Sequence, residues 1–302
     1  MTKIVHDTHL VAMALKKGSV VALPSETVYG LGASIYQEEA LKEIFSLKKR
    51  PQDNPLIVHA HDLKMIESIA YINDDFLKLY EAFMPGPLTV LLEKKQVSDT
   101  ITCGLNTVAI RIPSHPLFLE VIRFLDEPIA APSANLSGKP SSTQVEHVFK
   151  DFSPSLELIL DGGRSVGGIE STIIKLYKDR AVILRPGLIS KEAIEKVLEK
   201  PCHFSTKDTA IEAPGMKYRH YAPTAKVVLV DEIQLDHLVS EDVMILSEEK
   251  ILAPVWQELT AFNLYKAFRI ADDLNLSTIY VKMPSNLSLG LKNRLEKAAR
   301  GD

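Results

Sequence analysis

The sequence predicts an α/β fold in which a mixed, twisted sheet with helices is followed by a smaller α/β unit. Short apolar runs typical of buried strands alternate with amphipathic helical patterns through most of the 302 residues. One strand pair is joined by residues 178–180 alone, a connection too short for a crossover, which predicts an antiparallel hairpin in a sheet linked mainly by crossovers. Between Pro201 and Thr224 periodicity disappears, which indicates a linker.

The elements of the first unit follow from periodicity and from turn residues. Thr8 is the expected N-cap of the first helix, because apolar residues follow it at spacings of three and four and Gly18 ends the pattern. The other expected helices cover 37–49, 62–84 as one or two helices ended by Pro85-Gly86-Pro87, 116–125, 143–152 and 191–200. The expected strands cover 20–23, 56–59, 88–92, 108–112, 129–131, 156–160, 171–176 and 182–185.

The second unit resembles a small Rossmann-like α/β unit without the glycine fingerprint. Residues 226–230, 243–246 and 278–281 are expected to be parallel strands, with helices around 256–273 and 291–299. From Lys226 onward the chain carries 9 basic and 12 acidic residues, a balance that disfavours a nucleic-acid role for this unit. We therefore expect three segments: 1–200, a linker at 201–225, and 226–302.

Composition and charge exclude several classes of protein. The chain is 46% hydrophobic and 25% charged, which is ordinary for a folded protein and excludes disorder or a coiled coil. The formal net charge of −4 provides no overall positive field, so any polyanion must bind a local patch. Only Cys103 and Cys202 occur, too few for a zinc site or a disulfide framework. No apolar run approaches the roughly 18 residues of a membrane span, and no signal peptide is apparent; we expect a cytoplasmic protein without membrane association.

Three neighbouring cations end the helix expected at 37–49. Lys48, Lys49 and Arg50 directly precede Pro51, and the following loop leads into the strand that carries His59. Cations at a helix C-terminus interact favourably with the helix dipole, which is one interpretation. The other is a phosphate clamp, because a guanidinium fork grips phosphate oxygens in pairs and Lys adds a point charge.

A second candidate region is rich in hydroxyls and glycine. Residues 132–141 follow a buried strand and lead into a helix, and the carboxyl edge of an α/β sheet is where anions bind. A plain turn with Ser and Asn caps explains the same residues. Glycines at 162–168 and at 187 permit close backbone approach to a ligand, although tight turns need them equally.

Several familiar motifs are excluded. Gly163 to Gly168 has the glycine spacing of a P-loop, but Ile-Glu follows where Lys and Ser/Thr are required. The pair at Gly30 and Gly32 lacks the third glycine of a dinucleotide fingerprint. A metal pair at His59 and His61 is disfavoured because no nearby carboxylates complete it. Cys103, Ser133 and Ser171 have no His and Asp neighbours in sequence that would suggest an activated nucleophile, although partners in space remain open.

Taken together, these segments resemble the threonylcarbamoyl-adenylate synthase family, in the long form in which a YrdC-like domain precedes a smaller C-terminal domain. The resemblance covers most of the chain, and its blocks occur in family order: PSETVYGLG at 24–32, KKRP at 48–51, NPLIVH at 54–59, PGPLT at 85–89, VAIRIP at 108–113, APSANLSG at 131–138, LDGG at 160–163, EST at 170–172 and LRPG at 184–187. The segment PGMKYRHYAP at 214–223 resembles the linker of the two-domain form, and 293–295 resembles its C-terminal end.

The resemblance implies a reaction in which L-threonine, bicarbonate and ATP give threonylcarbamoyl-AMP and pyrophosphate. That product is passed to proteins that transfer the threonylcarbamoyl group to an adenosine of tRNA; direct tRNA binding by this chain stays open. Mg²⁺ is expected to accompany ATP, but the sequence offers no carboxylate cage and we assign no metal ligand. Such chemistry fits a site without a protein nucleophile, because it needs positioning and charge neutralisation.

The resemblance also implies roles for individual residues. The family's catalytic tetrad corresponds to Lys48, Arg50, Ser133 and Asn135. The expected ATP contacts are Arg50, Asn54, Thr107, Ser133, Ser141, Arg185 and Tyr221, the last as part of a lid formed by the linker. The expected threonine contacts are Thr27, His59, Arg111, the backbone near Ala131, and Ser171. Arg111 is the natural partner of the amino acid's carboxylate, because a fork-to-fork pair fixes orientation and charge.

Two departures from the family pattern and two other hypotheses accompany this interpretation. Ser25 stands where many members have Thr, and the unit from Lys226 is shorter than expected. A non-catalytic RNA-binding module that uses the basic cleft is the alternative function; its RNA affinity would fall steeply with salt. Carbamoyl transfer in metal-centre assembly is a third hypothesis, but the zinc-finger cysteines that accompany it are missing from the sequence.

Overall fold

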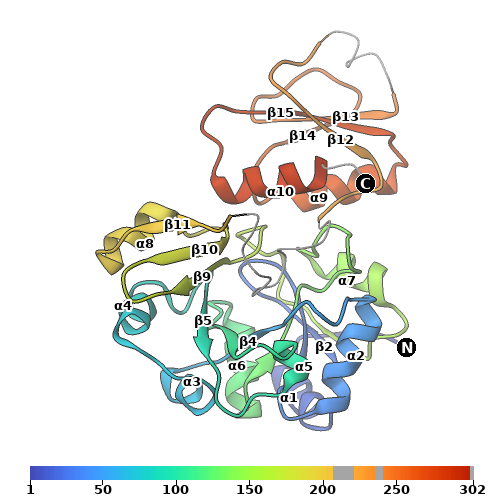
Figure 1. Cartoon of the computed structure of the whole chain (residues 1–302). Helices are drawn as coiled ribbons and strands as arrows, with labels where there is room; N and C mark the ends of the chain where they lie inside the picture. Colours follow the sequence, from blue (N-terminus) through green and yellow to red (C-terminus); the bar gives the residue numbers. More distant parts are fainter. Residues whose placement is uncertain (207–220, 235–240, 300–302) are drawn as a thin grey trace.

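The computed structural model describes residues 1–206, 221–234 and 241–299 and shows two lobes, each built around its own sheet (Figure 1). We call residues 1–206 the N-terminal unit and residues 221–299 the C-terminal unit. The described part of the N-terminal unit forms one 11-stranded sheet in the order β1-β8-β2-β3-β7-β4-β6-β5-β9-β10-β11. Parallel and antiparallel neighbours both occur in it, as the sequence predicts for a mixed sheet.

The strands of this sheet are short, two to six residues each. They are β1 (Lys3–Val5), β2 (Val21–Leu23), β3 (Gly30–Ser34), β4 (Ile57–His59), β5 (Leu88–Glu93), β6 (Thr107–Arg111), β7 (Ile129–Ala130), β8 (Leu158–Leu160), β9 (Thr172–Leu176), β10 (Ala181–Arg185) and β11 (Cys202–Phe204). The helices are α1 (Thr8–Lys16), α2 (Glu38–Lys48), α3 (Leu63–Ile69), α4 (Asp74–Phe83), α5 (Asp99–Thr102), α6 (Pro116–Leu125), α7 (Val145–Phe152) and α8 (Lys191–Leu198).

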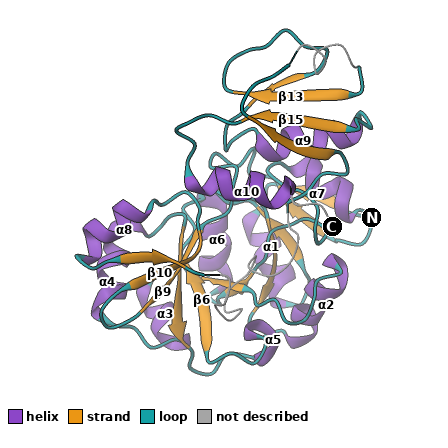
Figure 2. Cartoon of the chain, turned by 45° about the horizontal axis from the view of Figure 1, so that its top comes forward, coloured by secondary structure: helices purple, strands orange, loops and turns teal. Residues whose placement is uncertain are grey.

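Helices cover both faces of this sheet (Figure 2). Successive strand residues point to opposite faces, so Val21 and Leu23 pack with α1 and α6, while Ala22 packs in the larger core with α2, α4 and α7. The two cores hold the strands from both sides. The β9–β10 hairpin is antiparallel, which confirms the prediction made from its short connection.

The described residues of the C-terminal unit form a four-stranded sheet in the order β12-β15-β13-β14, with every strand parallel to its neighbours. They are β12 (Lys226–Val230), β13 (Val243–Ser247), β14 (Trp256–Glu258) and β15 (Thr278–Lys282), and the helices are α9 (Leu264–Asp273) and α10 (Leu289–Ala299). Figure 1 shows both helices between this sheet and the N-terminal unit. Val28 and Ile169 of the N-terminal unit belong to the same apolar cluster as these helices. The C-terminal core therefore continues across the contact between the two units, which we call the seam.

The structure corrects four details of the sequence prediction. The α1 N-cap is Asp7, whose carboxylate accepts from the Leu10 N–H, and not Thr8. Residues 256–258, expected within a helix, form β14 because they pair with β13. Residues 202–204, expected in the linker, form β11, which pairs with β10. Strands β1 and β3 were not expected at all.

The glycine pattern explains why β3 is invisible in a propensity analysis. A Cβ on Gly32 would lie 2.8 Å from Leu23 Cδ1 and 3.0 Å from Ile129 Cγ2, so any larger residue would force these packed side chains to shift. Close packing therefore overrides the low strand propensity of the GLGAS segment. Among the described residues, no helix combines the length and the apolar character needed to cross a membrane.

Candidate active site

One cavity collects side chains from segments that are far apart in the sequence. Its lining includes most of the residues that the sequence singled out: Thr27, Lys48, Arg50, His59, Arg111, Ala131, Ser133, Asn135, Ser171, Arg185 and Tyr221. It also includes Ser25, Val28, Tyr29, Gly30, Ile57, Phe118, Pro132, Ser137, Gly138 and Glu170. Four of these residues are Lys or Arg and only Glu170 is acidic, so the cavity suits an anion.

Lys48 supports the loop that follows β7. Its side chain is buried, and Nζ donates at 2.5 Å to the carbonyl oxygens of Ser133 and Asn135. The Ser137 N–H returns a bond to the Lys48 carbonyl at 3.0 Å. Burial, and then the nearby charge of Arg50, lower the pKa of Lys48 well below its usual value. The Lys48 side chain holds the loop backbone at the cavity wall through these two hydrogen bonds.

The side chains of this loop are also fixed by one another. Ser133 Oγ donates to Asn135 Oδ1 at 2.5 Å, and Asn135 Nδ2 donates to the carbonyls of Leu136 and Lys139, each at 2.8 Å. An amide that satisfies two backbone carbonyls fixes a tight loop without regular structure. The segment 133–142 is therefore a preformed cavity wall, and the three tetrad residues Lys48, Ser133 and Asn135 are its scaffold.

Arg50 follows the end of α2, where Lys49 adopts a left-handed conformation with φ 50°. Its Nε donates to the Asn54 carbonyl at 3.0 Å and its Nη2 to the Pro55 carbonyl at 2.8 Å. Burial lowers the pKa of Arg50 to about 10, and Arg185 adds to the lowering. The guanidinium is thus aimed by backbone acceptors while its positive charge faces the cavity with Arg185.

Arg111 lies in register with His59, because β4 and β6 are parallel neighbours. Its Nη2 pairs with Glu26 Oε1 at 2.5 Å, its Nη1 donates to Thr27 Oγ1 at 2.9 Å, and its Nε donates to the Gly86 carbonyl. Burial raises the pKa of Glu26, but Arg111 outweighs it and the net effect is to lower that pKa. Glu26 is therefore charged, and it neutralises the arginine that the sequence assigns to the substrate carboxylate.

His59 is buried beside Phe118, with 5.0 Å between the ring centroids. Burial, and then the charge of Arg111, lower the pKa of His59 to about 3. Its Nδ1 is buried and has no hydrogen-bond partner among the described residues. The imidazole is therefore neutral at physiological pH and carries a polar atom that a bound hydroxyl can satisfy.

Ser171 joins the two groups of expected contacts. Its Oγ lies 2.8 Å from Thr89 Oγ1 and accepts from Arg185 Nη2 at 3.2 Å, and its carbonyl accepts from Arg185 Nε at 3.2 Å. Arg185 is the last residue of β10 and Ser171 immediately precedes β9, so the hairpin brings them together. A residue expected to bind threonine therefore contacts one expected to bind ATP.

Tyr221 closes the cavity from the linker side. Only 5% of it is exposed, its φ is 70°, and its ring stacks on Tyr265 of α9 with 5.7 Å between centroids. A positive φ is costly for a tyrosine, and such strain concentrates at functional sites. The following Ala222 N–H donates to the Gly138 carbonyl, which ties the linker to the 133–142 segment. The rest of the predicted linker motif, 214–220, lies outside the described residues.

Three expected nucleotide contacts are not part of the cavity lining. Asn54 is buried and offers its carbonyl to Arg50, Thr107 lies at the start of β6 away from Arg111, and Ser141 is fully buried. Ser141 Oγ instead donates to Glu170 Oε1 at 2.5 Å. These residues adjoin lining residues or their strands without facing the cavity.

Sequence reasoning gave no role to two carboxylates of this region. Glu26 and Glu170 each lie inside a quoted motif, but nothing in the local sequence tells which arginine each one meets. Arg111 and Arg294 follow 85 and 124 residues later. A signal did exist: an acid beside an otherwise cationic and hydroxyl-rich motif is buried only when it is paired.

Two family models match the chain. One, of the Sua5, YciO and YrdC family and described as "Telomere recombination", matches residues 13–187. The other, described as the C-terminal domain of threonylcarbamoyl-AMP synthase, matches residues 189–300. The second match begins at residue 189 and so includes α8 and β11, although β11 belongs to the 11-stranded sheet of the N-terminal unit.

Relatives and solved structures agree with these models. Threonylcarbamoyl-AMP synthases from Pyrococcus abyssi and Bacillus subtilis are each 41% identical to the chain; the alignments cover 94% and 96% of it and 92% of each relative. The crystal structure of P. abyssi Sua5 complexed with L-threonine superposes with a TM-score of 0.90 at 39% identity, over 99% of this chain and 97% of that chain. The chain therefore belongs to the threonylcarbamoyl-AMP synthase family, in its two-domain form.

Proposed function

We propose that this chain is an L-threonylcarbamoyladenylate synthase, which makes threonylcarbamoyl-AMP and pyrophosphate from L-threonine, bicarbonate and ATP. The observation that carries the proposal is that Arg50, Ser133 and Arg185 line one cavity together with His59 and Arg111. Cations for a triphosphate and hydroxyl-binding groups for a small amino acid thus lie side by side. The relatives named above have the same activity in their names.

The chemistry needs charge neutralisation more than a protein nucleophile. The threonine amine and bicarbonate combine to a carbamate with loss of water. A carbamate oxygen then bonds to the α-phosphorus of ATP, the bond to the bridging oxygen breaks, and pyrophosphate leaves with that electron pair. Arg50 and Arg185 offset the charge of the triphosphate and of the leaving group, and preorganised cations of this kind supply much of the rate enhancement in phosphoryl chemistry.

We propose that threonine binds at the Arg111 end of the cavity. Its carboxylate would approach the guanidinium of Arg111, with the hydroxyls of Thr27 and Ser171 as further partners. The unpartnered Nδ1 of His59 supports a role in binding the substrate hydroxyl. Because Glu26 already neutralises Arg111, the carboxylate would have to share this cation, which favours orientation over affinity.

Mg²⁺ would arrive with ATP and not at a protein-built site. Among the described residues, no group of three His, Cys, Asp or Glu side chains is placed to hold a metal ion. The carboxylates nearest the cavity, Glu26 and Glu170, are each paired with an arginine. We therefore assign no residue to the metal and derive no step through it.

The remaining proposals concern partners and domain roles. Residues 1–200 would form the catalytic domain, 201–225 the linker and 226–302 the second domain, in a cytoplasmic protein. The product would pass to proteins that transfer the threonylcarbamoyl group to tRNA. The RNA-binding alternative has little support, because Lys48, Arg111 and Arg185 are buried around a cavity and form no open basic track.

The test is pyrophosphate release by the purified chain. We expect release from ATP only when threonine and bicarbonate are both present, with one threonylcarbamoyl-AMP formed per pyrophosphate. Serine and valine are matched controls, since each lacks one of the two groups on the threonine β-carbon. Pyrophosphate release that is indifferent to threonine would reject the proposal, and salt-sensitive RNA affinity without ATP turnover would favour the alternative.

A further inference from the structure

The C-terminal unit holds the segment 133–142 from two sides, although none of its described residues lines the cavity apart from Tyr221 of the linker end. This segment carries Ser133 and Asn135, and its first half is held within the N-terminal unit by Lys48. Its second half, 139–142, has different supports. Arg269 of α9 binds it from one side, and a carboxylate held by Arg294 of α10 binds it from the other.

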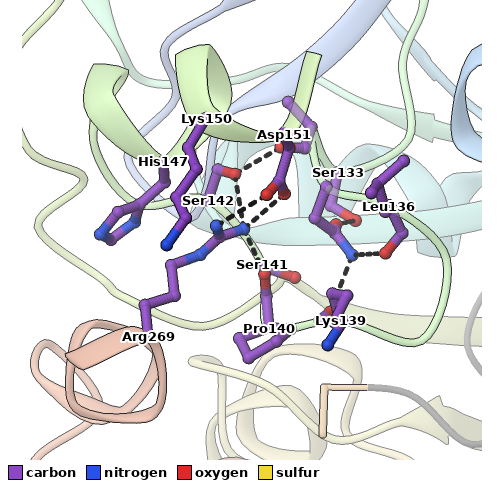
Figure 3. Close-up of polar contacts among 12 residues, drawn as sticks. Ser133, Leu136, Lys139, Pro140, Ser141, Ser142, His147, Lys150, Asp151 and Arg269 are labelled. Atoms are coloured by element: carbon purple, nitrogen blue, oxygen red, sulfur yellow. Dashed lines mark hydrogen bonds and ion pairs between the residues drawn. The ribbon is translucent and has the colours of Figure 1, made fainter. Parts of the chain in front are cut away.

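Arg269 makes the first of these contacts. Figure 3 shows its guanidinium reaching between Asp151 of α7 and the backbone of Pro140. Its Nη1 and Nη2 pair with Asp151 at 3.0 and 2.7 Å, while Nη2 also donates to the Pro140 carbonyl at 2.7 Å and to Ser142 Oγ at 3.1 Å. Ser142 Oγ in turn donates to the Ala134 carbonyl, next to Ser133. Arg269 thus holds the 139–142 stretch directly, and Ser142 links that stretch to Ala134.

The second contact passes through Glu170. Its Oε1 accepts from Ser141 Oγ at 2.5 Å, and its Oε2 accepts from Arg294 Nε at 2.7 Å and from Tyr265 Oη at 2.9 Å. Burial raises the pKa of Glu170, but Arg294 and then Arg185 outweigh it and lower that pKa to about 2. Glu170 is therefore an anion whose position is set by two residues of the C-terminal unit.

The contacts of Arg269 with the 139–142 stretch differ from an ion pair that only joins the two units. Lys150 and Asp273 pair across the same seam while both are largely exposed, and they touch neither the loop nor the cavity. Arg269, by contrast, is buried and adds two acceptors on the 139–142 stretch to its pair with Asp151. A buried guanidinium that donates hydrogen bonds to one short stretch of the chain fixes the geometry of that stretch.

We propose that Arg269 and Arg294 are positioning residues for the nucleotide end of the cavity, and that α9 and α10 thereby complete the ATP site without touching ATP. The inference rests on the proposed function, because it takes the 133–142 segment to face the nucleotide. It assigns to the C-terminal unit an effect on ATP binding that is separable from threonine binding. Threonine contacts such as Thr27 and His59 have no bond to either arginine.

The test compares Arg269→Ala with Lys150→Ala in the full chain, with the dissociation constants of ATP and of threonine measured separately by calorimetry. For Arg269→Ala we expect ATP to bind about tenfold more weakly, the equivalent of about 1.4 kcal/mol, while threonine affinity stays within twofold. Lys150→Ala removes a seam ion pair and should leave both constants within twofold. Equal weakening of ATP and threonine by Arg269→Ala, or no weakening of ATP, would overturn the inference.

Two milder variants keep the test decisive if Arg269→Ala does not fold. Arg269→Lys preserves the charge beside Asp151 but lacks the fork that reaches the loop, so ATP should still bind several-fold more weakly. Ser142→Ala removes one loop acceptor and leaves the ion pair in place; we expect about a threefold loss of ATP affinity, the range of one hydrogen bond. Wild-type ATP affinity in either variant would refute the positioning role.

Failure of this inference is distinguishable from failure of the proposed function. The wild-type chain alone decides the function, through pyrophosphate release that depends on threonine. If wild type passes and Arg269→Ala also shows unchanged ATP affinity, only the positioning role is lost. In the variant, we expect KM for ATP to rise while KM for threonine stays constant, a split that a merely unstable protein would not produce.

Discussion

The Lys48 side of the cavity and the Glu170 side differ in what holds their charges. Lys48 is held by the carbonyl oxygens of Ser133 and Asn135, which belong to the same unit of the fold. Glu170 is held by Arg294 and Tyr265, which belong to the other unit. The first side therefore follows from the fold of residues 1–206 alone. The second exists only while the two units are in contact, so the C-terminal unit can affect the reaction through it as well as through the Arg269 contacts.

Arg50→Ala tests the first side and should have the largest effect. The variant removes a cation aimed by the Asn54 and Pro55 carbonyls, and we expect kcat/KM for ATP to fall by about 100- to 1,000-fold, as when one transition-state donor is lost. The measurement is pyrophosphate release at varied ATP. Arg180→Ala, at an exposed arginine of the β9–β10 hairpin, is the control and should match wild type. A tenfold loss or less would remove Arg50 from the catalytic machinery.

Gly168→Ala tests the seam on which the second side depends. Its φ is +69°, and its Cβ would lie 2.1 Å from the Ala261 carbonyl oxygen of the C-terminal unit. We expect the free energy of unfolding to fall by about 1–2 kcal/mol because of the backbone conformation. The steric clash should lower it by about 1–3 kcal/mol more. Gly163→Ala is the matched control, because its φ is +74° and nothing lies within 4 Å of its Cβ.

Thermal unfolding of the two glycine variants separates these contributions. Both should melt below wild type, and Gly168→Ala should melt below Gly163→Ala by several degrees, since only the former pushes the units apart. Gly168→Ala should also weaken ATP binding, whereas Gly163→Ala should not. Equal melting temperatures would mean that the contact between the two units accommodates the added methyl group without destabilising the fold. The distinction between the two sides of the cavity would then be unsupported.

The same distinction explains which parts of the molecule the sequence could predict. The α/β class, the hairpin and the helix at 116–125 follow from periodicity and turn chemistry, which are local. The family resemblance correctly groups residues that meet in the cavity. Its motif blocks contain this information about spatial proximity, whereas hydrophobic periodicity does not. The ion-pair partners of Glu26, Glu170 and Arg269 are Arg111, Arg294 and Asp151. Each partner lies far away along the chain, so no local sequence pattern could identify it.

The errors have physical causes of the same kind. Strand β3 contains a glycine at position 32 because Leu23 and Ile129 lie close to where its Cβ would be, so a packing constraint overrides propensity. Strands β11 and β14 have three residues each and are defined by their neighbours β10 and β13. In each case, a tertiary contact decides the outcome.

His59→Phe sharpens the comparison from the threonine end. Phenylalanine keeps the ring beside Phe118 but removes the unpartnered Nδ1, so we expect KM for threonine to rise about tenfold, the range of a lost buried hydrogen bond, with KM for ATP unchanged. Because burial lowers the pKa of His59 to about 3, this residue should add no titration step to threonine binding between about pH 6 and 8. His61→Phe is the control. A rise in KM for ATP, or a pH step near 6.5 that the variant abolishes, would contradict this account.

Acid isolates the Glu170 side. The pKa of Glu170 is lowered to about 2 from the usual 4.5, so its anion stabilises the folded chain fully above about pH 4.5, and that contribution is lost as the pH falls through 2. Below about pH 4.5 the stabilisation of the folded chain by this anion should therefore decline steadily as the pH falls. In Glu170→Gln this dependence is missing, so the melting-temperature gap between wild type and variant should be widest near pH 6 and should narrow towards pH 3. A gap that stays constant across this range would mean that the anion is not what joins Arg294 to the cavity wall, and the two sides would then differ only in location.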